Sequence, residues 1–155
     1  MIGHKIYKLA KELWPINRSI TGDGVRTSLK KLQKIIPDLK IVENSSRKKV
    51  FDWKIPDEWN VSEAWLKGPD GKKIADFSRN NLSLVGYSVP IKSSFTLNKI
   101  KKHIHTIKKQ PNAIPYVTSY YKKTWGFCIA YKKFKKLKKG KYEVYINSEI
   151  KNGHL

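Results

Sequence analysis

Cysteine and arginine are scarce in this chain, and long apolar runs are missing from it. Cys128 is the one cysteine among 155 residues, so the chain has no partner for an internal disulfide, which fits a reducing compartment. The first residues alternate Lys with Ile and Leu, and they therefore lack the uncharged apolar segment of a secretory signal. No run approaches the ~20 apolar residues that cross a bilayer. These absences predict a cytoplasmic protein without a membrane span.

The basic residues carry a net charge of +21, with 33 Lys and Arg against 12 Asp and Glu. A charge of this size usually indicates nucleic acid or an anionic membrane surface as partner. The only arginines are Arg18, Arg26, Arg47 and Arg79, whereas the guanidinium fork is what phosphate and guanine recognition favours. The lysines are spread along the whole chain, as on a solvated surface. We therefore expect nonspecific binding to polyanions, and a basic nucleic-acid or anionic-surface binding module is the alternative function.

Two helices are predicted at the start of the chain. Apolar residues recur at helical spacing from Ile2 to Leu13, with Lys and Glu on the other faces. Residues 17–24 are polar and contain two glycines, so they are expected to form a loop in which Thr21 or Asp23 caps a second helix. The apolar spacing of this second helix continues until Pro37.

Beyond residue 37 the pattern favours short strands separated by turn signals. The fold class predicted is therefore α+β, with two N-terminal helices followed by a small β-rich unit. The polar segment 44–49 is the candidate boundary between them. Thr96 is expected to cap a short helix that includes Ile100 and Ile104. Strands are predicted at residues 39–42, 59–66, 73–77, 82–89, 116–121, 125–131 and 142–150.

Several side chains with reactive chemistry have an ordinary structural interpretation. His103 and His105 form a His-x-His pair that on a strand could bind a transition metal, but the helical pattern around them makes the two side chains diverge. Cys128 lies in an apolar run, which is typical of a buried thiol and not of a nucleophile. Surface or turn roles are expected for the neighbouring carboxylates Asp52, Asp57 and Glu58.

Residues 131–141 interleave apolar residues with pairs of lysines. A short helix here would place Tyr131, Phe134 and Leu137 on one stripe surrounded by ammonium groups, a shape that suits an anionic membrane or RNA. The alternative is a solvated helix or turn that packs these three residues inward. We favour the alternative, because an apolar stripe at constant spacing usually faces a core, and stacking platforms need exposed rings.

Five segments, in this order and over most of the chain, together resemble a known family. It is a bacterial family of zinc-aminopeptidase-like proteins, often found near polysaccharide-biosynthesis genes, in which a peptidase domain carries a small inserted domain and precedes a winged helix. The resemblance implies that residues 1–44 and 141–155 belong to a peptidase-type α/β domain and that residues 45–140 form a β-rich inserted domain. The segments are LWPINRSITGDGVR (13–26), KVFDWKIPDEWNVSEAWLKGPDGKKIADFS (49–78), NLSLVGYSVP (81–90), HTIKKQPNAIPYVTSYYKKTWGFCIA (105–130) and KYEVYINSEIKNG (141–153).

The resemblance also implies that the zinc of the complete family is bound by a His, Asp and Glu cluster beyond these segments. No catalytic residue, metal ligand or cofactor is therefore assigned to this chain. We expect an N-terminal fragment of a zinc-dependent aminopeptidase-like hydrolase that is inactive alone, with a noncatalytic interaction domain as a further alternative. Its expected partners are the missing C-terminal peptidase portion or a second copy, because residues 142–150 are expected to expose an unpaired strand edge.

Six side chains are predicted to line a substrate cleft in a complete protein. Arg18, Ser19 and Thr21 come from the loop before the second helix. Tyr120, Tyr121 and Trp125 follow the proline segment. Thr21 as a helix cap and Trp125 as a core residue are the competing interpretations.

Overall fold

The computed structural model describes residues 2–154, which fold as two compact units. Unit 1 contains the chain up to Asn60 and again from Ile150, and unit 2 contains residues 61–149. Helices and open sheets are both present, so the α+β class is confirmed. The predicted domain boundaries at residues 44/45 and 140/141 separate a partial peptidase domain from an inserted domain. This assignment stays a prediction. Every helix among the described residues is too short and too polar to cross a membrane.

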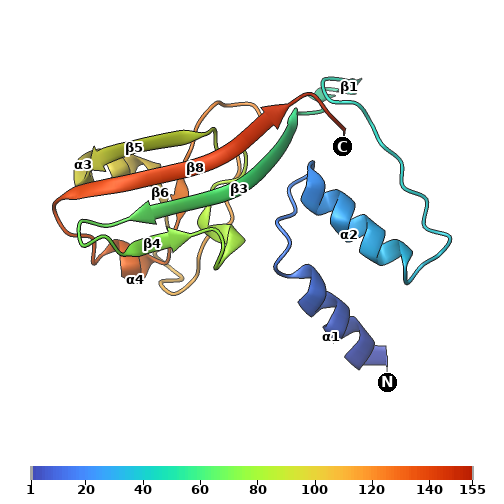
Figure 1. Ribbon diagram of the computed structural model, residues 1–155, viewed down its shortest axis with the longest axis horizontal. Coiled ribbons are helices and arrows are strands. Elements are labelled where there is room, and N and C mark those ends of the chain that lie inside the picture. Colours follow the sequence, from blue (N-terminus) through green and yellow to red (C-terminus); the bar gives the residue numbers. More distant parts are fainter. Residues whose placement is uncertain (1, 155) are drawn as a thin grey trace. The chain divides into compact units, whose positions relative to one another are not determined.

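Unit 1 begins with two helices, α1 (Ile2–Leu13) and α2 (Asp23–Gln33), at the positions that the apolar spacing predicts. A small antiparallel pair follows, formed by β1 (Lys49–Val50) and β2 (Trp53–Lys54). Figure 1 shows a long connection between α2 and β1, which contains residues 39–42. No strand forms there, because these residues have no neighbouring strand to pair with.

The predicted cap of α2 is wrong. Gly22 occupies the N-cap position with φ 98°, and no side chain caps the helix. Thr21 is buried and accepts a hydrogen bond from the backbone of Trp59 instead, at 3.2 Å. A residue that is bonded to a segment 38 positions away is not available to the helix N-terminus.

Unit 2 is built on a four-stranded sheet with the order β4-β3-β8-β5. Both outer pairs, β3 with β4 and β5 with β8, are antiparallel. Figure 1 draws the arrows of the two central strands, β3 and β8, in opposite directions. The strands are β3 (Glu58–Lys67), β4 (Lys73–Asp76), β5 (Ile91–Thr96) and β8 (Lys141–Lys151).

The central position of β8 corrects the expected unpaired edge over the first part of residues 142–150. β8 lies between β3 and β5, and β5 pairs with residues 141–146, so both edges of that part are occupied. Tyr142, Val144 and Ile146 alternate with more exposed residues and are almost fully buried. The alternation correctly predicts a strand with one buried face, but it carries no information about how many neighbours the strand has.

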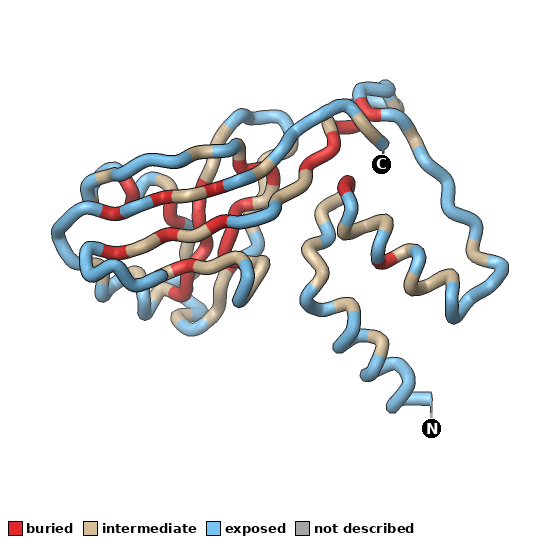
Figure 2. Tube along the Cα trace, viewed as in Figure 1, coloured by how far each residue is buried: buried red, intermediate tan, exposed pale blue. Residues whose placement is uncertain are grey.

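Shorter elements complete unit 2 and cover the buried face of the sheet. Figure 2 shows the buried positions concentrated in this unit, while α1 in unit 1 has none. Ile100, Phe127 and Cys128 are fully buried there. The elements are the 3-10 turns η1 (Asn81–Ser83) and η2 (Lys101–His103), the helices α3 (Leu97–Ile100) and α4 (Tyr131–Phe134), and the parallel pair β6 (Ile104–His105) and β7 (Phe127–Cys128).

Three predicted strands of unit 2 are wrong or much shorter. Residues 82–89 and 116–121 form isolated bridges and no ladder, and of residues 125–131 only Phe127–Cys128 is a strand. Asn80 turns the chain at η1 by accepting a hydrogen bond from the backbone of Leu82 at 3.0 Å. Tyr87 then takes φ 63°, which interrupts any extended run. Thr96 precedes α3 but makes no side-chain cap.

Candidate functional site

The loop before α2 is attached to the start of β3 in unit 1. The backbone N–H of Asp23 donates to the side-chain oxygen of Asn60 at 2.8 Å, beside the Thr21 contact with Trp59. A Cβ on Gly22 would lie 2.5 Å from the carbonyl oxygen of Trp59, and φ at this position is 98°. Both the space and the backbone conformation therefore require glycine, and the close approach fixes where α2 begins.

A bidentate ion pair joins α2 to β3 behind this loop. The two terminal nitrogens of Arg26 each donate to one oxygen of Glu58 at 2.6 Å. Glu58 also accepts from the side chain of Asn60 at 3.1 Å and from the backbone of His154 at 3.4 Å. Its side chain is 5% exposed, so the expected surface role of Glu58 is wrong. Asp23 adds a second, exposed carboxylate 3.1 Å from Arg26.

The pairing shifts the titration of both partners. The hydrogen bonds from Arg26 lower the pKa of Glu58 to about 2, against the opposing effect of burial. Glu58 in turn raises the pKa of Arg26 above its ordinary value, chiefly through the same hydrogen bonds. Glu58 is therefore a carboxylate at neutral pH, and with its charge satisfied by four donors it is a poor general base.

The end of the described chain closes over this pair. The backbone N–H of Gly153 donates to the hydroxyl of Ser46 at 3.1 Å, and the N–H of Ser46 donates back to the Gly153 carbonyl at 2.9 Å. A Cβ on Gly153 would overlap the carboxylate of Glu58. Residues that are far apart in the sequence thus build one polar cluster, which consists of Arg26, Ser46, Glu58, Asn60 and Gly153.

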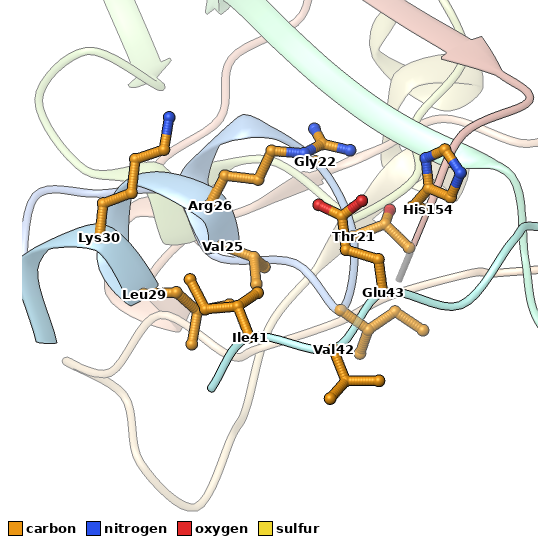
Figure 3. A pocket seen from close by; sticks show the side chains of 11 residues that line it. Thr21, Gly22, Val25, Arg26, Leu29, Lys30, Ile41, Val42, Glu43 and His154 are labelled. Atoms are coloured by element: carbon orange, nitrogen blue, oxygen red, sulfur yellow. The ribbon is translucent and has the colours of Figure 1, made fainter. Parts of the chain in front are cut away.

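A hollow of about 80 Å³ lies beside the polar cluster. Figure 3 shows apolar side chains, among them Leu29 and Ile41, together at one part of its wall, and polar groups such as Arg26 and His154 at another. Small-molecule sites usually measure ~300 to 1,000 Å³, so this hollow has room for one small side chain and not for a substrate. Its lining residues are Ile20, Thr21, Gly22, Val25, Arg26, Leu29, Lys30, Ile41, Val42, Glu43 and His154.

The predicted cleft residues of unit 1 have different surroundings. Arg18 is exposed and donates at 2.6 Å to the carbonyl of Leu13, which also accepts from the backbone of Ile16 at the end of α1. Ser19 is half-buried in the loop, and Thr21 lines the hollow. Their placement at a substrate cleft stays a prediction.

The predicted cleft residues of unit 2 divide between two aromatic clusters. The ring of Tyr120 meets that of Tyr87 edge-on at 5.0 Å and lies 6.4 Å from that of Tyr121. Trp125 stacks on His103 with 3.8 Å between ring centroids, and its carbonyl is hydrogen-bonded to the imidazole Nδ1 at 3.0 Å. The structure therefore brings Tyr120 and Tyr121 together and gives Trp125 a separate partner. A role of these three residues in a substrate cleft is likewise untested.

The side chains considered above for covalent or metal chemistry are those of His103, His105 and Cys128. Within residues 2–154 no three His, Cys, Asp or Glu side chains converge as metal ligands would. His103 is the last residue of η2, and His105 lies on β6. Of the two residues predicted to lie on a helix, only His103 is in a helical turn. Cys128 is fully buried, as predicted, and burial raises the pKa of its thiol to about 12.

The geometry of unit 2, a four-stranded sheet with short helices, defines a small α+β domain. A family model described as a domain of unknown function, DUF2172, matches residues 58–149. The chain belongs to this family. The match includes Glu58 and Asn60 of the polar cluster, and it covers the whole of unit 2.

Two comparisons extend beyond the family domain. The chain is 46% identical, over 153 residues, to a Clostridium acetobutylicum protein described as a "putative polysaccharide biosynthesis protein with aminopeptidase-like domain". It is also 46% identical to a chain in a crystal structure described as a "putative peptidase" from Clostridium acetobutylicum, with a TM-score of 0.93. Both matches cover 99% of this chain, but only 35% and 36% of the respective relatives. The chain thus spans about a third of their length.

Proposed function

We propose that this chain supplies the N-terminal, noncatalytic part of a zinc-dependent aminopeptidase-like hydrolase and is inactive alone. The observation that carries the proposal is the 46% identity and the TM-score of 0.93 to the "putative peptidase" along nearly the whole chain. Because 64% of that structure has no counterpart here, we assign the reacting groups of such a hydrolase to that other part.

The donor set of this chain supports a noncatalytic role. A zinc hydrolase needs about three protein ligands around the ion and an open position for water. The described residues contain no such group, and the imidazole of His103 stacks on Trp125. These residues do not fit a zinc ion, so no step of hydrolysis is assigned to them.

The first helix supports an association with a further part of the protein. α1 has no buried residue, and its apolar stripe leaves Ile2 78% and Ile6 62% exposed. An amphipathic helix normally covers such a stripe against another element. We assign this stripe to a contact with the rest of such a hydrolase, because 65% of the relative's length lies outside the part that matches this chain.

Reconstitution tests the proposal. The part of the Clostridium acetobutylicum relative that this chain does not cover would be expressed separately and mixed with the chain and zinc. We expect the two to co-purify, and hydrolysis of aminoacyl nitroanilides to require the second part. Ile6→Gln should weaken the complex, while Lys8→Gln, a polar change on the same helix, serves as the control. Hydrolysis by the chain alone, with zinc retained after dialysis, would contradict the proposal.

A further inference from the structure

A lysine-lined groove of about 480 Å³ lies in unit 2, separate from the polar cluster. One wall is the turn before β4 together with the start of that strand, and the other runs from α4 to the start of β8. This volume falls within the range of small-molecule sites. The lining residues are Pro69, Asp70, Lys72, Lys73, Ile74, Lys133, Lys136, Leu137, Lys138, Lys139 and Tyr142.

Local contacts fix both walls of the groove. In the first wall, the N–H of Lys72 donates to the carboxylate of Asp70 at 3.2 Å. In the second, the hydroxyl of Tyr142 donates to the carbonyl of Lys138 at 2.7 Å. A Cβ on Gly140 would lie 2.6 Å from the ring of Pro69, and φ at Gly140 is 146°, so glycine allows the two walls to meet. The groove is therefore a formed feature and not a chance gap between loose loops.

The charge in the groove is largely uncompensated. Six lysines face one lining carboxylate, Asp70. Lys73 is paired with Asp76 at 3.0 Å, while the other five lysines form no ion pair with any residue from 2 to 154. Ile74 and Leu137 supply half-buried apolar surface between the lysines, and this surface lowers the local dielectric constant and strengthens the attraction for an anion.

We propose that this groove binds a compact ligand that carries two or more adjacent phosphate groups. Lysine binds phosphate as a point charge, and several lysines in a limited volume favour a multiply charged anion over a single one. No arginine lines the groove, and the ring of Tyr142 is fully buried, so neither a guanidinium fork nor a stacking face is available to read a base. The number of phosphates, and not the identity of an attached nucleoside, should set the affinity.

Calorimetric titration of the complete chain tests this inference with inorganic tripolyphosphate, diphosphate, monophosphate and ATP at fixed ionic strength. We expect affinity to rise from monophosphate to tripolyphosphate. Equal binding of ATP and tripolyphosphate identifies the phosphate chain as the recognised group, whereas much tighter binding of ATP would overturn the inference, because the nucleoside would then set the affinity. The groove variant is Lys133→Gln/Lys136→Gln/Lys139→Gln. It is expected to bind tripolyphosphate roughly tenfold more weakly, because each exposed charge contributes a few-fold.

A matched control removes the same charge elsewhere on unit 2, with Lys92→Gln/Lys108→Gln/Lys123→Gln at three exposed positions. This control should bind within about threefold of the parent, since distant surface charges are screened. Equal losses in the two variants would overturn the inference and attribute binding to net charge. Affinity that does not increase with the number of phosphates would overturn the inference as well. So would a duplex DNA that binds the parent more tightly than tripolyphosphate does and binds the groove variant equally well.

Discussion

The ion pair between Arg26 and Glu58 should be the largest single electrostatic contribution to the stability of unit 1. Two substitutions break it from opposite sides. Arg26→Met leaves the carboxylate of Glu58, which is 5% exposed, without its counter-ion. Glu58→Gln leaves Arg26, which is 32% exposed, with water as an alternative partner. The first change should therefore be the more costly.

The magnitude follows from the burial of each group. Removing one partner of a buried pair costs about 3 to 5 kcal/mol, and we expect the lower end for Arg26→Met because a third of the Arg26 side chain reaches solvent. Glu58→Gln should cost about 2 kcal/mol. Asp23→Asn is the matched control, since the Asp23 side chain contacts the same guanidinium but is 79% exposed. It should cost less than about 0.5 kcal/mol.

The same pair predicts a pH dependence with a defined sign. Arg26 holds the pKa of Glu58 at about 2 in the folded protein, below its ordinary value of 4.5. The unfolded state therefore takes up the proton more readily, and acid favours unfolding. The contribution, about 2 to 3 kcal/mol, is fully present above pH ~4.5 and is lost as the pH falls towards ~2. Glu58→Gln should lack this component.

Hydrogen exchange measured by mass spectrometry separates the two units in one experiment. The amides of Ser46, Arg47 and Ile55 are hydrogen-bonded within unit 1, so their protection reports its opening free energy after correction for the intrinsic rate at each pH. Peptides within residues 61–149 serve as the internal control. Protection of the unit 1 amides that falls no further in Glu58→Gln than in Asp23→Asn would refute the reasoning.

Three further predictions concern other parts of the chain. Gly22→Ala should destabilise unit 1 by about 2 kcal/mol or more, because it combines a positive φ with a clash against Trp59. Gly71→Ala, with φ 73° and open space around it, should cost only about 1 kcal/mol, and denaturant titration compares the two. Cys128 should resist iodoacetamide in the native state and react only after denaturation, since its thiol is buried with a pKa near 12; labelling of native protein would contradict this. The chain without a partner should self-associate through the apolar stripe of α1, and sedimentation should show less association for Ile6→Gln than for Lys8→Gln.

Strong periodicity was enough to predict the regular elements. The apolar spacing of α1 and the alternation in β8 each give the correct element, because one face of each repeats over about ten residues. The edge strand β5 has no such signal, since only Ile91 and Phe95 are even half-buried in it, and it was missed. Residues 82–89 carry apolar side chains into the core from a bent backbone, so their composition favours a strand that does not form.

The polar cluster could not be predicted from local pattern. Its central pair joins residues 32 positions apart, and hydropathy places Glu58 on the surface. One feature of the sequence does point to the position of this pair, namely the scarcity of arginine. Two of the four arginines, Arg26 and Arg47, form bidentate pairs with carboxylates, and the partner of Arg47 is Asp57. In a chain that uses lysine for solubility, an arginine indicates a position where the planar fork is needed.

The two units differ in when each can be completed during synthesis. Unit 2 is one continuous stretch, so all of its residues are available once position 149 has left the ribosome. Unit 1 is discontinuous. The amide of Ser46 obtains its acceptor, and the carboxylate of Glu58 obtains the last of its four donors, only when Gly153 and His154 have been translated. Residues 2–60 therefore lack their contacts with the end of the chain while the 89 residues of unit 2 are translated. During synthesis the N-terminal segment is therefore the part of the chain that stays longest without its full set of contacts.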